Sequence, residues 1–204
     1  MTILNIHPNR ERARLGFKDA VLASYGFLCA LSFRPVKEDV TFVRYESAKV
    51  FVNIYHGRSS YELGVEIGRL SEPEKKVTLY EIVAWAGAEK TEGFGQHVMF
   101  QASTREAVQE CVPKLARLTQ EYGTLFLKAD ITAYQDVRDV RSRDWAEYQK
   151  QVNLAQVRQK AEHAWHSKDY PQVVQLYGVV HEDLSDVEVK RLAYAERQVI
   201  SEKK

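Results

Sequence analysis

The segment 49–70, with the sequence KVFVNIYHGRSSYELGVEIGRL, constrains the fold of this chain more than any other stretch. It contains two runs in which apolar residues alternate with other residues, separated by a turn-like sequence at His56–Ser59. The alternating apolar positions are Val50, Val52, Ile54, Tyr61, Leu63, Val65 and Ile67. A period of two is typical of β-strands that bury one face, so the segment predicts a β-hairpin.

The pairing of the two strands follows from the rule that directly opposed residues share a face. A four-residue loop at His56–Ser59 keeps apolar residues together, because it pairs Ile54 with Tyr61. On the other face the same loop places Phe51 opposite Gly64. The predicted hairpin therefore has one apolar face and one mainly polar face.

Two further strands are predicted upstream of the hairpin. Residues 40–46 form the neighbouring strand, joined to the hairpin by a two-residue turn at Ser47–Ala48, and residues 33–36 form a short edge strand. Pro35 fits an edge strand, because proline lacks the N–H group that a central strand needs.

The rest of the chain is helical in pattern. Apolar residues at spacings of three and four predict a helix at about 9–31. Serine or threonine followed three residues later by glutamate is a capping box, and such pairs beginning at Thr78 and Ser103 predict two helix starts. A long helix is expected from about Asp130, and 88–102 is expected to be a loop.

Together these patterns predict an α+β fold. We expect a three- to four-stranded antiparallel meander packed on helices, followed by an all-helical C-terminal half. The expected domains are an α+β sheet domain at 1–128 and, at 129–204, a long helix with a helical hairpin. A chain of 204 residues is long enough to form a normal hydrophobic core.

The mainly polar face of the sheet is the surface on which we place a candidate site. It carries charged, amide and aromatic side chains around Gly64 and Gly68, and the hairpin tip adds residues that can contact an anion. The candidate ligand or partner face consists of Arg44, Phe51, Asn53, Tyr55, His56, Arg58, Glu62 and Glu66. The alternative is an ordinary solvated face, on which charges pair across strands and aromatic rings cover strand glycines.

The C-terminal region carries a repeat-like pattern. Small residues and Trp165 precede a tight turn sequence at 168–171, KDYP, and an apolar helical run follows it. Ser185 and Glu188 then form a capping box for a final helix. The segment 154–197 resembles one and a half tetratricopeptide units. With fewer than three repeats, such a hairpin must pack on the preceding helix or on a partner.

A wider resemblance covers most of the chain. The run 42–70, the downstream sequence FQAST and the Ala-Trp…Lys-Asp-Tyr hairpin at 164–170 are similar to those of a group of small uncharacterised bacterial proteins. This resemblance implies a bacterial, cytoplasmic protein and brings no activity, substrate or catalytic residue with it.

Composition and charge exclude several classes of function. The net charge is +1, with 45% hydrophobic and 28% charged residues, which is typical of a soluble protein without a membrane span. The N-terminal sequence lacks the pattern of a secretory signal, so a cytoplasmic location is expected. This charge balance argues against nucleic-acid binding, for which Arg10, Arg12, Arg14 and Lys18 would supply the basic patch.

Motifs of cofactor and metal sites are missing. The glycines at 93 and 95 lack the remaining residues of a phosphate-binding loop, and the histidines lack metal-ligand spacing. The two cysteines, Cys29 and Cys111, are expected to be buried and cannot build a disulfide framework. We therefore expect no cofactor, no metal and no assembled catalytic residues, which favours a protein that is not an enzyme.

These observations favour a protein that acts by binding another protein, and an immunity or antitoxin-like binder is one specific form of that hypothesis. The tyrosine-rich composition, with 11 Tyr, suits interfaces because tyrosine combines apolar area with a polar tip. The alternative is a small-ligand-binding protein, or an enzyme that lacks recognisable motifs, using the polar face of the sheet. No membrane partner is expected, and the sequence carries no signal for an oligomeric state.

Overall fold

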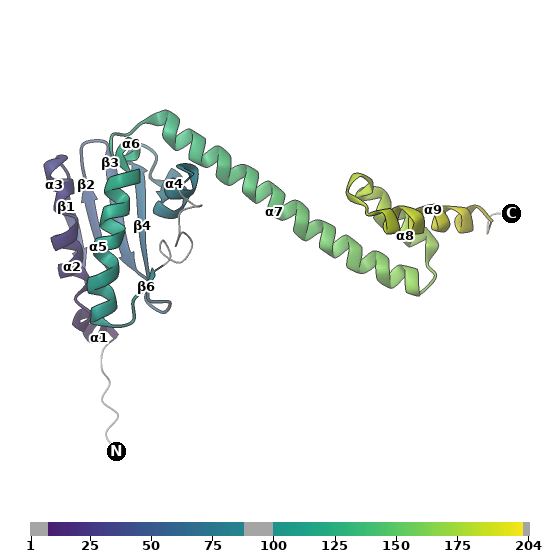
Figure 1. Cartoon of the computed structure of the whole chain (residues 1–204), viewed down its shortest axis with the longest axis horizontal. Helices are drawn as coiled ribbons and strands as arrows, with labels where there is room; N and C mark the ends of the chain where they lie inside the picture. The colour runs from purple at the N-terminus through teal and green to yellow at the C-terminus, as the bar shows by residue number, and fades with distance from the viewer. Residues whose placement is uncertain (1–7, 88–99, 202–204) are drawn as a thin grey trace, which may run out of the picture. The chain divides into compact units, whose positions relative to one another are not determined.

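A computed structural model describes residues 8–87 and 100–201 of the chain (Figure 1). The fold is α+β, with an antiparallel sheet and a helical C-terminal half, as the sequence predicts. The chain forms two compact units, which we call the sheet unit (Met1–Arg141) and the helical unit (Ser142–Lys204). Their boundary falls within one helix, α7 (Ile131–His166).

Residues 8–30 form short helices instead of the expected continuous helix at 9–31. These are α1 (Pro8–Arg14), α2 (Phe17–Ser24) and α3 (Phe27–Ala30). The first break occurs at Gly16, whose φ of 69° is left-handed and therefore favours glycine over other residues. The second break lies at Tyr25 and Gly26, between α2 and α3.

Within residues 8–87 and 100–201 the sheet has six strands, more than the three or four that the sequence predicts. Its strands are β1 (Arg34–Asp39), β2 (Phe42–Glu46), β3 (Val50–His56), β4 (Glu62–Arg69), β5 (Val77–Thr78) and β6 (Phe100–Gln101). The order is β1-β2-β3-β4-β5, β6 also pairs with β4, and every pairing is antiparallel. The two additional strands have two residues each, too few for an alternating pattern to reveal them.

The register of the β3–β4 hairpin differs from the predicted one by four residues. Ile54 lies opposite Val65 rather than Tyr61, and Phe51 lies opposite Gly68 rather than Gly64. The loop is 58–61, not 56–59, and Tyr61 closes it with a left-handed φ of 55°. The shift is an even number, so each strand residue keeps its predicted face.

The β2–β3 register is also shifted by an even number of residues. Arg44 lies opposite Asn53, whereas the predicted turn at Ser47–Ala48 would have set it opposite Phe51. Ser47 instead takes part in closing the turn, because its backbone N–H donates to the carbonyl of Val50 over 2.9 Å.

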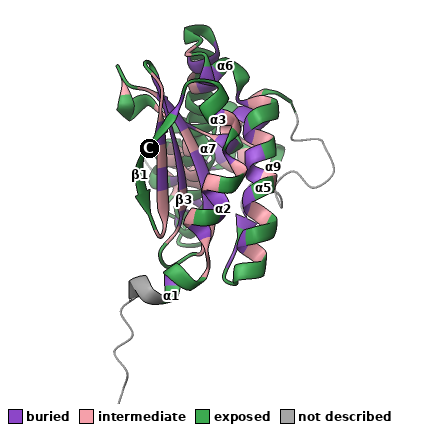
Figure 2. Ribbon diagram, turned by 90° about the vertical axis from the view of Figure 1, so that its left-hand side faces the viewer, coloured by how far each residue is buried: buried purple, intermediate pink, exposed green. Residues whose placement is uncertain are grey.

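The core of the sheet unit lies between one face of the sheet and the helices that cover it (Figure 2). Helices α2 and α5 (Arg105–Tyr122) lie on that face, and α4 (Leu79–Trp85) and α6 (Thr124–Leu127) complete the layer. A short 3-10 helix (Pro73–Lys75) precedes β5. The buried strand residues of this face are Val43, Tyr45, Val50, Val52, Ile54, Leu63, Val65 and Ile67.

The first turns of α7 belong to the sheet unit. Ala133, Tyr134 and Val137 are buried in its core, and the Tyr134 hydroxyl donates to the carbonyl of Phe126 over 3.1 Å. The compact sheet unit therefore extends to residue 141, beyond the expected boundary at 128.

The helical unit contains the rest of α7, then α8 (Tyr170–Val179), a 3-10 helix (His181–Asp183) and α9 (Asp186–Ser201). Its small core consists of Ala161, Ala164, Val173, Tyr177, Leu192 and Ala195. The predicted capping box is present before α9: the Ser185 N–H donates to the Glu188 carboxylate over 2.7 Å, and the Ser185 hydroxyl oxygen accepts from the Glu188 N–H over 3.4 Å. At the start of α5 the capping residue is Thr104 rather than the predicted Ser103. The Thr104 side chain accepts a hydrogen bond from the Ala107 N–H.

Candidate functional site

Charged and amide side chains on the polar face of the sheet form a hydrogen-bonded row across three strands. Arg44 donates from Nε to Glu46 over 2.6 Å and from Nη1 to Asn53 Oδ1 over 3.4 Å. Asn53 Nδ2 donates to Glu66 over 3.1 Å, and Lys76 Nζ donates to the same carboxylate oxygen over 2.7 Å. We call these five residues the polar row. Each of its charges has a partner of opposite charge.

Two aromatic rings close the surface over the strand glycines. Phe51 lies against Gly68 and Tyr55 against Gly64, so that an added Cβ would come within 2.4 Å and 2.2 Å of the respective rings. The Arg44 guanidinium lies 4.1 Å from the centroid of the Phe51 ring, which is only 1% exposed. The two rings thus fill the space above Gly64 and Gly68, and no hollow remains there.

The environment of Tyr55 keeps its phenol protonated. Burial raises the pKa of Tyr55, and the nearby carboxylates of Glu62 and Glu66 raise it further because they disfavour a phenolate. Tyr55 can therefore donate a hydrogen bond at neutral pH but is not poised to act as a base.

His56 is not at the hairpin tip but in the core, where it is 1% exposed. It is the last residue of β3, and it lies on the same face as Val52 and Ile54. Its ring packs on Phe17 with centroids 5.5 Å apart and on Tyr61 at 5.9 Å. This corrects the predicted position of His56 in the hairpin loop, and the even spacing from Val52 and Ile54 is the sequence signal that indicates the apolar face.

Burial and a neighbouring arginine both favour the neutral form of His56. His56 Nε2 lies 2.9 Å from the carbonyl oxygen of Ala102, which can only accept, so we assign the ring proton to Nε2. Nδ1 is then the ring's acceptor, and Arg12 Nη1 lies 3.4 Å from it and 3.3 Å from Nε2. Burial lowers the pKa of His56, and the Arg12 charge lowers it further.

Arg12 also binds the backbone of the hairpin loop. Its Nη2 donates to the carbonyl of Gly57 over 2.6 Å and to that of Arg58, and its guanidinium lies 3.8 Å from the Tyr61 ring centroid. Arg12 is 7% exposed and therefore cannot contribute to the basic patch considered for nucleic acid. The Arg58 side chain is exposed on the loop.

The structure thus brings six of the eight predicted face residues together and separates the other two. Arg44, Phe51, Asn53, Tyr55, Glu62 and Glu66 share the polar face, whereas His56 belongs to the core and Arg58 to the loop. Within residues 8–87 and 100–201, no cluster of three or more His, Cys, Asp or Glu side chains could hold a metal ion.

The two cysteines differ in exposure, and Cys111 has a perturbed thiol. Cys29 is exposed, contrary to the expected burial, and Cys111 is half-buried; both are free thiols. Burial raises the pKa of the Cys111 thiol, and Glu110 raises it further, so the thiol is disfavoured as a nucleophile.

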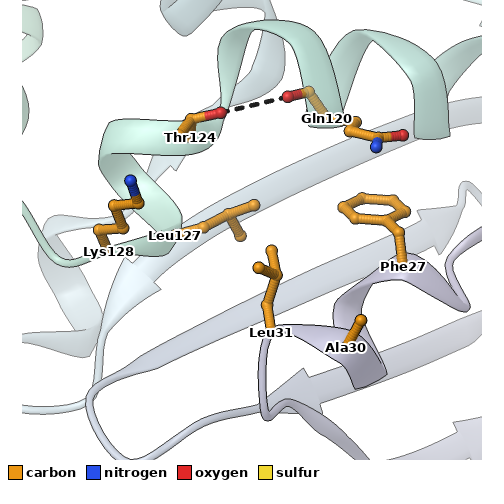
Figure 3. Close-up of a pocket in the computed structure, with 7 residues that line it drawn as sticks. All are labelled: Phe27, Ala30, Leu31, Gln120, Thr124, Leu127 and Lys128. Carbon is orange, nitrogen blue, oxygen red and sulfur yellow. Dashed lines mark hydrogen bonds between the residues drawn. The ribbon is translucent and has the colours of Figure 1, made fainter.

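A cavity of about 550 Å³ lies on the helical side of the sheet unit (Figure 3). Its walls come from α3 on one side and from the end of α5, α6 and the residue after α6 on the other. The lining residues are Phe27, Ala30, Leu31, Gln120, Thr124, Leu127 and Lys128. Sequence reasoning missed this cavity, because it joins segments about ninety residues apart that carry no motif.

The helical unit has an open groove of about 470 Å³. Aromatic, apolar and cationic side chains from the end of α7, the following turn, α8 and α9 line it. They are Trp165, His166, Lys168, Tyr170, Val187, Lys190, Arg191 and Tyr194. The repeat-like sequence pattern indicated the helical hairpin but not this groove.

These features define an α+β protein with an antiparallel sheet, a paired polar face and a helical unit. Comparison with protein-family models, curated proteins and solved structures found no match. Among the helices of the described segments, none is both long and apolar enough to span a membrane. Function must therefore be argued from the surfaces themselves.

Proposed function

We propose that this protein acts by binding another protein and that the helical unit carries the binding surface. The observation that supports this proposal is the group of large apolar side chains that the unit exposes. They are Trp145, Tyr148, Val179, Val187, Val189, Tyr194 and Ile200. Contiguous exposed apolar side chains mark interaction sites, and within this set Trp145 and Tyr148 contact each other.

Trp145 and Tyr148 are the strongest candidates for an anchor of such an interface. Their rings contact each other with centroids 5.8 Å apart, and they are 62% and 59% exposed. Both lie at the three- and four-residue spacing of apolar residues that predicts packing within the chain, and their exposure contradicts that prediction. Tryptophan and tyrosine dominate binding energies at interfaces, because they bury large areas at a small entropy cost.

The polar face of the sheet supports a binding role less well. The side chains of the polar row form hydrogen bonds with one another. The rings of Phe51 and Tyr55 cover Gly68 and Gly64. This arrangement favours the solvated-face interpretation over a ligand site or an active site on the sheet.

A narrower form of the proposal is a bacterial, cytoplasmic immunity or antitoxin-like protein that sequesters a toxin. The hairpin of α7 and α8, with its tight turn at 168–170, supports a relation to tetratricopeptide units.

The proposal is tested by affinity capture from a bacterial lysate with the full chain as bait. Wild-type protein and the control variant Ile131→Ser, which removes an exposed apolar residue of the sheet unit, should retain the same partner. Trp145→Ser and Tyr148→Ser should lose it while keeping wild-type circular dichroism. Failure of the wild-type bait to recover any protein above background would refute the proposal, and recovery of a toxin would support the narrower form.

A second candidate function is the binding of a small amphiphilic molecule in the cavity of Figure 3. Its volume lies within the range of small-ligand sites, and Lys128 at its edge makes no ion pair within the described residues. Titration with anilinonaphthalene sulfonate, an apolar fluorophore with one negative charge, tests this function. Binding should be saturable in the wild type and abolished by Ala30→Phe, which fills the cavity.

A further inference from the structure

We propose that the groove of the helical unit binds an acidic peptide segment of the partner, with one apolar side chain of that segment inserted between Tyr194 and Val187. This inference rests on the proposed function and specifies the chemistry of the segment that is bound. The groove lies wholly within the helical unit, between the end of α7, the start of α8 and α9.

The floor of the groove is a cluster of three aromatic rings. Trp165, Tyr170 and Tyr194 contact each other in edge-to-face geometry, with centroids 5.5–6.0 Å apart. Tyr194 is 41% exposed, and neighbouring Val187 is also exposed. The cluster therefore presents a rigid apolar surface to solvent, suited to an aliphatic or aromatic anchor.

The rim of the groove is cationic. Lys168 and Lys190 make no ion pair with any described residue. Arg191 lies 5.5 Å from the Trp165 ring centroid and 3.8 Å from Glu162, so its charge is only partly offset. Unpaired cations beside an apolar floor complement a segment that combines carboxylates with an apolar side chain.

No carboxylate is among the described residues that line the groove. Glu162 lies 3.6 Å from His166 Nε2 as well as near Arg191, and it stands on the α7 side of the rim. The two unpaired lysines lie on the turn after α7 and on α9. The surplus positive charge is therefore centred on Lys168 and Lys190.

The backbone fixes the position of Lys168. This residue has a left-handed φ of 59° in the turn that ends α7, and Asp169 next to it caps α8 by accepting from the Gln172 N–H over 3.1 Å. A cation on such a turn is presented by a defined backbone rather than by a mobile loop.

The positive charge of the rim is local, because the helical unit as a whole is not basic. Residues 142–204 contain ten Lys and Arg and ten Asp and Glu. Single-stranded nucleic acid, the other polyanion that uses aromatic and cationic groups, needs open ring faces for base stacking. Here Arg191 lies over Trp165 and the three rings pack edge to face, which favours an acidic peptide.

The test measures fluorescence anisotropy of labelled peptides with the full-length protein. The probes are short peptides in which Leu, Phe or Trp is flanked on both sides by Glu, the same peptides with Gln in place of Glu, and an oligothymidylate. At least one Glu peptide should bind saturably, with affinity that falls as salt is raised, and its Gln counterpart should bind markedly more weakly.

Variants locate the binding in the groove. Lys190→Glu and Lys168→Glu should each weaken binding of the Glu peptide by at least about fivefold, because each removes one exposed charge pair and adds a repulsive charge. Tyr194→Ala should lower the affinity for both the Glu and the Gln peptides. Arg143→Glu, which reverses an exposed cation of the same unit outside the groove, should leave binding unchanged.

Three outcomes would overturn the inference: no saturable binding of any Glu peptide, equal affinity for Glu and Gln peptides, or tighter binding of the oligothymidylate. They are distinguishable from a failure of the proposed function. If Trp145→Ser still abolishes capture of a partner while every Glu peptide fails, protein binding stands and only the acidic segment is wrong.

Discussion

The ring of Phe51 occupies the space that a side chain on Gly68 would need. A Cβ at Gly68 would lie 2.4 Å from Phe51 Cζ, and Phe51 itself is almost fully buried beneath Arg44. The two residues are directly opposed on β3 and β4, so the ring covers a glycine that would otherwise leave the strand bare.

We expect Gly68→Ala to destabilise the protein. The buried ring cannot move away freely, so the substitution should lower the free energy of unfolding by about 1–3 kcal/mol. Gly64→Ala is the matched control, because Tyr55 lies over Gly64 in the same way but is half-buried and can turn toward solvent. Urea unfolding of both variants checks this, and equal losses would contradict the role assigned to Phe51.

Acidification should destabilise the wild type through His56. Because burial and Arg12 lower the pKa of folded His56 below its ordinary 6.5, the unfolded chain binds the proton more readily. The stabilisation is therefore present above pH 6.5 and is lost as the pH falls toward the lowered pKa. His56→Gln retains an N–H donor for Ala102 and an acceptor for Arg12 but does not titrate, so its stability should depend less on pH between 7.5 and about 5.5 in thermal unfolding. An unchanged pH dependence would show that His56 does not titrate in this way.

Removing the Arg12 side chain should cost more than removing an exposed arginine of the same helix. Arg12→Ala leaves the carbonyls of Gly57 and Arg58 and the ring of His56 without their cationic donor. The expected loss is about 2–3 kcal/mol, since hydrogen bonds from charged groups are among the stronger ones. Arg14→Ala should change stability by less than about 0.5 kcal/mol. Chemical unfolding separates the two, and similar losses would argue against an anchoring role for Arg12.

The contributions of Arg141 and Glu81 to the free energy of unfolding should be measurably coupled. Arg141 Nη2 donates to Glu81 Oε2 over 2.7 Å and to the carbonyl of Lys76 over 3.0 Å, and Glu81 also completes the capping box of α4. A double-mutant cycle with Arg141→Ala and Glu81→Gln should give a coupling energy of about 0.5–1 kcal/mol, which salt should reduce because the pair is partly exposed. The cycle of Arg138→Ala with Glu81→Gln serves as the control and should give a value near zero.

Alternation in the sequence was enough to assign the faces of the sheet but not to align its strands. Val52 and Ile54 face the core and Asn53 faces outward, as their alternation predicts. The register was wrong by even numbers in both hairpins, because an even shift leaves the apolar pattern unchanged. What selects the true alignment is the turn, and a left-handed Tyr61 carries no strong sequence signal.

The candidate surfaces were harder to predict than the strands. The pairing of His56 with Arg12 joins residues 44 positions apart, and the cavity beside Leu31 joins α3 to α6. Such contacts depend on how helices pack rather than on local periodicity. The helical hairpin at Tyr170 was recognised because its turn and caps are local, whereas the charges around its groove come from separate helices.

Side chains alternate between the two faces along β3 and β4, and this alternation determines which insertions the hairpin can accept. Extra residues within 58–61 lengthen the loop and leave every opposed pair in place. A single residue inserted in the middle of β3 would turn over the side chains on one side of the insertion, moving Ile54 out of the core or Asn53 into it. Two inserted residues would keep every side chain on its present face. Length variation among natural versions of this chain should therefore occur freely in the loop and in steps of two within the strands.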